Sequence, residues 1–158
     1  MNRTNQPFAN AVKHYPNFKA LFRQFCDAAA KQLNGNAQLP LVSFSVMSDG
    51  NSASLHALGR TFDISLRFVI LDNIPWGVLE VTVPGETREP VRLFHVLFDE
   101  LGNVKDTLDN SAPARGSFQS SESLAIFLDQ VVEKYFSYLQ NLKGLRAPMQ
   151  ISPDLKGM

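Results

Sequence analysis

The stretch that decides the fold runs from Ala53 to Val83 and reads ASLHALGRTFDISLRFVILDNIPWGVLEVTV. Apolar residues alternate with polar ones along it, as they do in strands that bury one face. Two short turn signals, Gly59-Arg60 and Asp72-Asn73, divide the stretch into three strands. It therefore predicts a twisted antiparallel meander with one apolar face and one wetter, polar face.

The two turns predict a register that keeps one face apolar from end to end. Across the first turn, the predicted apolar pairs are Ala57 with Phe62, Leu55 with Ile64 and Ala53 with Leu66. Across the second turn, they are Leu66 with Leu79, Ile64 with Val81 and Phe62 with Val83. The predicted polar pairs are His56 with Asp63, Ser54 with Ser65, Ser65 with Glu80 and Asp63 with Thr82. A slip of one residue in either hairpin would mix the two faces.

Helical periodicity flanks the meander on both sides. Before it, apolar residues at helical spacing predict a helix over 17–33, with Pro16 as part of its start signal. After it, the best periodic run of the chain predicts a longer helix over 121–142 with a serine N-cap. We expect the longer helix to lie across the apolar face with the first helix beside it. Alternatively, one helix covers the second face of a strand at 91–98.

The complete pattern belongs to the α+β class. It predicts an antiparallel five- to six-stranded meander, which includes strands at 42–46 and 91–98, between an N-terminal helix and a long C-terminal helix. The expected organisation is a partly ordered N-terminal segment over 1–16, a single domain over 17–145 and a flexible tail over 146–158.

Composition narrows the classes of function. The chain has 158 residues, with fifteen basic and fifteen acidic side chains, so no net charge attracts nucleic acid. Its single cysteine excludes an intramolecular disulfide, and no apolar run approaches the length of a membrane span. We expect a cytoplasmic protein that binds neither nucleic acid nor membrane. Twelve phenylalanines predict a Phe-rich core or interface.

The polar face of the meander carries the candidates for chemistry. His56 and Asp63 are predicted neighbours, with Arg67 and Glu80 close by, and a carboxylate beside an imidazole can orient a general base. A polar cross-strand ladder is the favoured alternative, because sheet faces commonly carry such pairs. No catalytic residue is therefore assigned.

No metal or cofactor site is predicted. The three histidines, His14, His56 and His95, lack the spacing of a metal motif, and no glycine-rich phosphate loop is present. Cys26 lies beside the apolar face of the first helix and is expected to be an inert packing group. The acidic residues around 99–109 do not match a calcium loop and predict a solvated rim.

The strand at 91–98 is apolar on both faces, and two registers for it stay open. If Thr82 pairs with Arg92, apolar residues of this strand and its neighbour fall on the wetter face. The opposite register buries Phe94 and Phe98 and leaves Leu93 and Leu97 outside. Either register leaves apolar side chains that would mark a partner surface unless another segment covers them. The candidate partner-binding residues are Trp76, Val78, Phe94, Val96 and Phe98.

These patterns favour a small soluble interaction module without enzymatic activity, such as an adaptor, inhibitor or regulator. It would bind a protein partner, or itself as a homodimer, through an apolar sheet face. One alternative is a carrier of a small apolar ligand, with a cavity between the C-terminal helix and the sheet. A second, disfavoured alternative is a hydrolase-like enzyme that uses His56 and Asp63.

Overall fold

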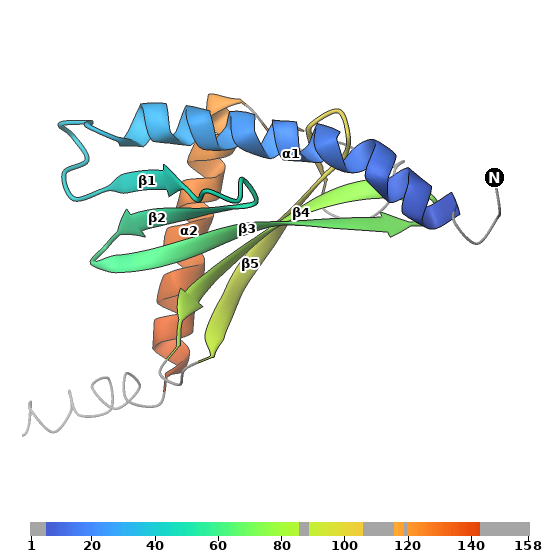
Figure 1. The fold of residues 1–158 in the computed structure, drawn as a ribbon. Coiled ribbons are helices and arrows are strands. Elements are labelled where there is room, and N and C mark those ends of the chain that lie inside the picture. Colours follow the sequence, from blue (N-terminus) through green and yellow to red (C-terminus); the bar gives the residue numbers. More distant parts are fainter. Residues whose placement is uncertain (1–5, 86–88, 106–115, 119, 143–158) are drawn as a thin grey trace, which may run out of the picture.

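A computed structural model describes residues 6–85, 89–105, 116–118 and 120–142 of the protein. The elements in chain order are α1 (Gln6–Leu33), β1 (Ser43–Val46), β2 (Ser52–Ala57), β3 (Arg60–Leu71), β4 (Ile74–Pro84), β5 (Pro90–Phe98), β6 (Asn103–Lys105), β7 (Gly116–Ser117) and α2 (Ser121–Asn141). The strands form one sheet in sequence order, and neighbouring strands are antiparallel (Figure 1). The predicted α+β meander between two helices is confirmed. The sheet has seven strands rather than five or six, because the short β7 lies in a segment predicted to be a loop.

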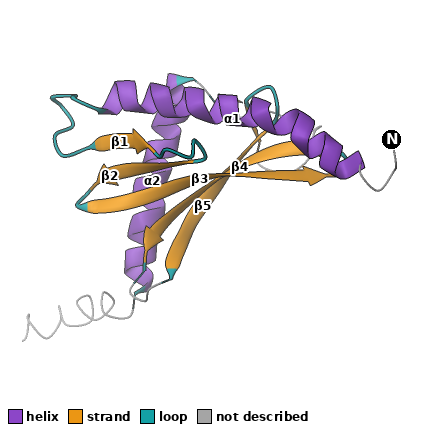
Figure 2. Cartoon of the chain, viewed as in Figure 1, coloured by secondary structure: helices purple, strands orange, loops and turns teal. Residues whose placement is uncertain are grey.

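Both helices pack on the same face of the sheet. α1 contacts β1, β3 and β4, α2 contacts β5, and the two helices contact each other. A single buried cluster joins side chains of α1, α2 and the strands between them. Figure 2 shows α2 crossing the direction of α1 at a steep angle. The expectation that the helices share the apolar face is therefore confirmed.

Aromatic rings connect the helices to each other and to the sheet. Phe25 of α1 stacks on Phe118, with 4.8 Å between ring centroids, and meets Phe127 of α2 edge-on at 5.2 Å. Farther along α2, Tyr135 meets Phe62 of β3 edge-on at 5.2 Å. The predicted Phe-rich core is thus observed where α1, α2 and the sheet meet.

Helix α1 begins well before its predicted start. It begins at Gln6 and continues through Pro16, although an internal proline removes a backbone hydrogen bond. Long-range contacts hold the first turns: the Tyr15 hydroxyl donates to Asn51 Oδ1 at 2.6 Å, and its ring meets Phe68 edge-on. The predicted start of the helix at residue 17 is therefore wrong, since residues 6–16 belong to α1.

Helix α2 has the predicted start. The Ser120 hydroxyl is its N-cap and accepts a hydrogen bond from the Ser123 backbone N–H at 3.0 Å. The helix ends at Asn141, and the Leu142 N–H donates to the carbonyl of Leu139. The predicted tail over 146–158 lies outside the described residues.

The first hairpin of the meander turns one residue earlier than predicted. Leu58 and Gly59 both have positive φ, 56° and 70°, and Ala57 pairs with Arg60. Turns of this type prefer glycine at their second central position, which places the turn at Leu58-Gly59 rather than Gly59-Arg60. The predicted register is consequently wrong by two residues: Leu55 pairs with Phe62. A shift of two leaves every side chain on its predicted face.

The second hairpin matches the predicted one. Asp72 and Asn73 have positive φ, 52° and 63°, and form its turn. The predicted pairs Leu66–Leu79, Ile64–Val81, Ser65–Glu80 and Asp63–Thr82 are all observed. The longest hairpin of the sheet therefore keeps one apolar face. Its other face is polar at Asp63 and Ser65 and apolar toward the turn, where Val69 pairs with Trp76 and Leu71 with Ile74.

A β-bulge settles the register of β5. Thr82 pairs with Arg92, but Val81 pairs with Phe94, so Leu93 is an extra residue opposite β4. Each of the two predicted registers is thus correct on one side of the bulge. Beyond it, Phe94 and Phe98 join the core face, whereas His95 lies opposite Glu80 on the other face.

Close packing at the end of β5 explains a glycine in β4. Gly77 pairs with Phe98, and a Cβ atom at position 77 would overlap the Phe98 ring. That ring stacks on Phe118 with 4.2 Å between centroids and an interplanar angle of 7°. The aromatic residue therefore fills the space that a β4 side chain would otherwise occupy.

Candidate functional site

The β1 edge of the sheet is capped by a side chain from the end of α1. The Phe44 backbone N–H donates to Asn34 Oδ1 at 2.7 Å, and Asn34 Nδ2 donates to the Phe44 carbonyl at 2.8 Å. The amide therefore bonds the outward N–H and C=O groups of Phe44, in the middle of β1, as a neighbouring strand would. Such caps prevent a sheet edge from pairing with another chain.

The β5 edge differs, because β6 covers only its end. β6 pairs with Leu97 and Phe98, and among the described residues no strand pairs with the outer side of β5 over 90–96. The Asp99 N–H donates to the Asn103 carbonyl at 3.0 Å, so the backbone groups of Asp99 point away from β4. Backbone direction alternates along a strand, which makes the His95 N–H and C=O point to this open side as well.

A groove of about 450 Å³ lies along the open edge, between β5, β6 and α2. Its lining combines apolar side chains of the sheet with basic and polar side chains from both layers. The lining residues are Arg92, Leu93, Phe94, His95, Val96, Leu97, Val104, Lys105, Gln130 and Lys134. Among the described residues that line the groove none is acidic, so this part of the lining is basic although the net charge of the chain is zero.

Two exposed basic side chains of the groove come from different elements, Arg92 from β5 beside the bulge and Lys134 from α2. Arg92 lies just before the bulge, opposite Thr82, and its side chain is 60% exposed. Its guanidinium is 4.0 Å from Glu80, whose carboxylate is held more closely by Arg67 at 3.0 Å. Lys134 is exposed and lies one helical turn after Gln130, so both residues face the groove from α2. Arg92 and Lys134 are therefore both accessible to a bound molecule.

The predicted polar candidates do not form the expected pair. His56 lies opposite Thr61, and its Nδ1 is 3.0 Å from the Thr61 hydroxyl. Asp63 lies opposite Ser54 instead, at 3.4 Å from its hydroxyl. The predicted His56–Asp63 pair is wrong, because the first hairpin is shifted by two residues.

The remaining polar-face candidates, Arg67 and Glu80, form an ion pair across β3 and β4. Glu80 also lies opposite His95 in β5. These side chains make a polar ladder on the sheet face, which was the favoured prediction.

The five candidate partner-binding residues do not form an exposed patch. Trp76 and Phe98 are both 0% exposed, and Phe94 is buried, whereas Val78 and Val96 are half-buried. The expected exposure is wrong because the bulge turns Phe94 and Phe98 into the core. Phe94 and Val96 nevertheless line the groove, and their part in binding stays a prediction.

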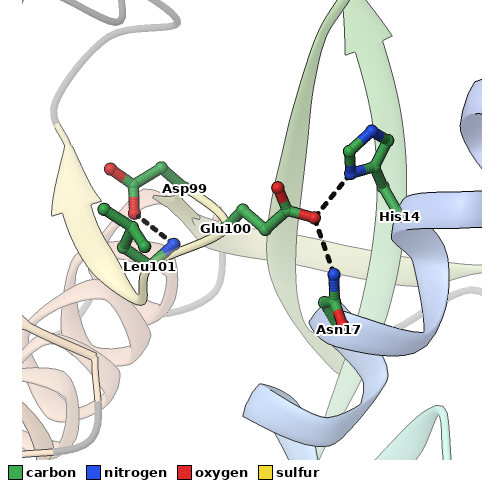
Figure 3. Close-up of polar contacts among 5 residues, drawn as sticks. All are labelled: His14, Asn17, Asp99, Glu100 and Leu101. Atoms are coloured by element: carbon green, nitrogen blue, oxygen red, sulfur yellow. Dashed lines mark hydrogen bonds and ion pairs between the residues drawn. The ribbon is translucent and has the colours of Figure 1, made fainter.

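Two acidic residues hold the β5–β6 turn, and one of them, Glu100, joins it to α1 (Figure 3). Glu100 Oε2 accepts hydrogen bonds from Asn17 Nδ2 at 2.8 Å and from His14 Nδ1 at 2.6 Å. These bonds, that from Asn17 first, lower the pKa of the Glu100 carboxyl below its ordinary value. Asp99 holds the turn itself, since its Oδ1 accepts the backbone N–H groups of Leu101 and Asn103. In the described part of the predicted acidic rim, both carboxylates thus hold structure together.

The structure also bears on the predictions for the cysteine, for a metal site and for a membrane span. Cys26 is buried in the core, and burial raises the pKa of its thiol to about 12, so the thiol is protonated at neutral pH. Within the described ranges, no three histidine, cysteine or acidic side chains gather closely enough to hold a metal ion. In the same ranges, no helix is long and apolar enough to cross a membrane.

Two cavities lie between α2 and the sheet. One of about 40 Å³ has Phe25, Val96, Val104 and Phe127 among its lining residues. The other, of about 160 Å³, is lined by side chains of β3, β4 and the last turns of α2, among them the polar groups of Arg60, Tyr135 and Tyr138. A cavity that binds benzene has a volume of roughly 150 Å³. The smaller cavity is therefore too small for such a ligand, and the apolar-carrier hypothesis stays a prediction for the larger one.

The groove includes residues that the sequence did not single out, namely Gln130 and Lys134 of α2. Their helical spacing and the strand at 91–98 were both predictable, but the position of α2 beside that strand was not. Comparison with protein-family models, curated proteins and solved structures gives no significant match to the chain.

Proposed function

We propose that the protein is an interaction module that binds an extended segment of a partner protein at the open edge of β5. The observation that carries this proposal is the contrast between the two edges. Asn34 caps β1, whereas residues 90–96 of β5 have no strand neighbour on their outer side within the described chain. A groove of about 450 Å³ beside β5 offers room for the side chains of a bound segment.

Strand addition suits this geometry. In that binding mode, backbone hydrogen bonds give affinity, and pockets for alternate side chains give specificity. The outward N–H and C=O of His95 would supply one pair of backbone bonds. Phe94 and Val96, on the core side of β5, would contact the apolar side chains of the guest.

A partner of different sequence is favoured over a second copy of this chain. Antiparallel pairing of two β5 edges would bring two basic grooves together, with Arg92 and Lys134 of each copy near those of the other. Like charges facing each other across a strand pair are destabilising. The homodimer expected from the sequence is thus the less favoured form of the interaction.

The test uses peptides of about twelve residues, selected from a random display library on the immobilised full chain. Their dissociation constants are measured by fluorescence anisotropy on wild type, His95→Pro and His95→Thr. Proline is tolerated at an edge position whose N–H faces solvent, but it cannot donate to an added strand. Threonine keeps the N–H and removes only the imidazole, so it is the matched control.

We expect His95→Pro to weaken binding about tenfold or more, because one backbone bond is lost and its acceptor is left unpaired. His95→Thr should lose clearly less than His95→Pro, because it keeps the backbone bond and removes only the contact of the imidazole. Equal binding by wild type and His95→Pro would overturn strand addition, as would equal losses in the two variants.

Amide hydrogen exchange on the wild type gives a second readout that does not depend on a variant's folding. The His95 amide should exchange rapidly in the free protein and become protected in the peptide complex. Protection that appears only at residues outside β5 would place the peptide elsewhere and refute the proposal.

A further inference from the structure

We infer that the segment bound at β5 alternates acidic and apolar residues, an inference that rests on the proposed function. The two faces of the open edge differ in chemistry. Arg92 and His95 lie on the face away from the core, whereas Phe94 and Val96 lie on the core side. Successive side chains of an added strand point to opposite faces, so its two rows of side chains meet these two surfaces separately.

The outer row of the guest meets nitrogen-bearing side chains. Arg92 offers a fork of N–H donors, and His95 is exposed two places beyond the bulge residue Leu93. On the described part of this sheet face, Glu80 lies opposite His95 and already accepts from Arg67 at 3.0 Å. A carboxylate of the guest therefore finds a donor surface whose acidic neighbour is already paired.

The helix adds a basic group on the other side of the groove. Lys134 and Gln130 project along the flank of α2 that lines the groove. The acidic residues Asp129 and Glu133 are exposed, but neither lines the groove. At about 100° per residue they fall on the side of α2 turned away from the buried Val131. The basic character of the groove is thus not cancelled by the adjacent carboxylates.

The inner row of the guest meets an apolar surface. Val96 and Val104 are half-buried beside the groove, and Phe94 closes its floor. Apolar side chains of the guest would cover this surface and remove it from water. Acidic side chains suit the outer row of the guest, which meets Arg92 and His95, and apolar side chains suit the inner row, which meets Phe94 and Val96. Together these preferences specify a guest in which acidic and apolar residues alternate.

Four short synthetic peptides with blocked ends test the inference. The first alternates Val with Glu, the second has Gln in place of Glu, and the third has Lys. The fourth has the composition of the first with its Val and Glu residues in separate blocks. Binding to the full chain is followed by the shifts of β5 backbone amides, which report both affinity and place.

We expect the alternating Glu peptide to bind about tenfold more tightly than the Gln peptide, because charge-assisted hydrogen bonds are the stronger ones. The Lys and block peptides should bind more weakly still. Raising ionic strength from about 0.1 M to 1 M should reduce the advantage of Glu over Gln, since the screening length falls from about 10 Å to 3 Å. Arg92→Gln should weaken the Glu peptide more than the Gln peptide. Lys134→Gln should show the same difference to a smaller extent, because Lys134 lies on the α2 side of the groove, away from the outer row.

The outcomes separate this inference from the proposed function. Equal affinities of the Glu and Gln peptides, with shifts at β5, would refute the acidic preference and leave strand addition standing. Equal affinities of the alternating and block peptides would refute the alternation. No shift of β5 amides with any peptide would overturn strand addition and this inference together.

Discussion

Replacing two phenylalanines of α2 separately provides a quantitative test of how this helix lies on the sheet. Phe127 is 5% exposed, and its ring contacts Phe25 at 5.2 Å and Phe94 at 5.5 Å between centroids. Phe136 is on the same helix but is 48% exposed. The two residues have the same side chain and helical backbone, so Phe136→Ala is a matched control for Phe127→Ala.

The expected losses differ several-fold. Truncation of a fully buried phenylalanine costs about 3–5 kcal/mol, which is the expectation for Phe127→Ala. Full burial of a phenylalanine contributes roughly 1.5–3 kcal/mol, so the half-exposed Phe136 contributes about 1 kcal/mol. The higher helix propensity of alanine returns about 0.5 kcal/mol, which leaves a net loss near 0.5 kcal/mol for Phe136→Ala. The apolar periodicity alone had placed both residues in the core.

Urea denaturation followed by circular dichroism measures both losses. The urea concentration at the unfolding midpoint should fall strongly for Phe127→Ala and little for Phe136→Ala. The slope of the unfolding free energy against urea concentration should stay the same. Losses of similar size would show that the helix is rotated about its axis relative to the structure. A small loss for both would show that α2 does not cover the sheet in solution.

Three further perturbations test the packing of the sheet and its attachments. Gly77→Ala should lower the free energy of unfolding by about 1–3 kcal/mol, because the new methyl group overlaps the Phe98 ring. Calorimetry would show the loss, and an unchanged Tm would contradict the close packing. Asn34→Ala should lower the free energy of unfolding by about 1–2 kcal/mol, because the two hydrogen bonds to Phe44 are lost. The Phe44 backbone amide should then exchange rapidly. Continued protection of that amide would mean that the Asn34 side chain is not its partner. Glu100→Gln should be less stable than wild type near pH 6, and the difference should shrink as the pH falls. The pKa of Glu100 is lowered in the folded protein, so its contribution is present above the unfolded value of about 4.3 and is lost as pH falls through the folded value. Urea titrations at pH 6 and at about pH 3 measure this trend, and a constant difference would contradict it.

Local chemistry made most of the fold predictable. Alternation in the meander gave the faces of Leu66, Ile64 and Glu80, because a strand with one buried face tolerates no slip of one residue. The same rule permits a slip of two, which is why the first hairpin was misplaced while its faces were right. The position of Gly59 within its turn decides between these registers.

Contacts between distant residues could not be predicted from the sequence. The extension of α1 through Pro16 depends on Tyr15 and His14 reaching Asn51 and Glu100, which lie far along the chain. No local sequence pattern predicts such pairs. Helical propensity alone therefore favoured a start after the proline.

The candidate site was only partly predictable. A strand apolar on both faces pointed to β5, and the bulge at Leu93 explains why neither simple register fitted it. Lys134 and Gln130 belong to the site only because α2 crosses the sheet beside β5. The crossing direction depends on ring packing around Phe25 and Phe127, and helical periodicity does not encode it.

The amide of Asn34 has a consequence for stoichiometry. A sheet with two open edges can accept one strand and offer another, and repeated addition then builds a filament of indefinite length. Here the hydrogen bonds between Asn34 and Phe44 occupy the middle of the β1 edge, whereas among the described residues no strand pairs with the outer side of β5 over 90–96. Under the proposed strand addition, each molecule would take one guest at β5 and offer no equal edge for the next. Assembly through this sheet would terminate as a one-to-one complex instead of propagating as a fibre.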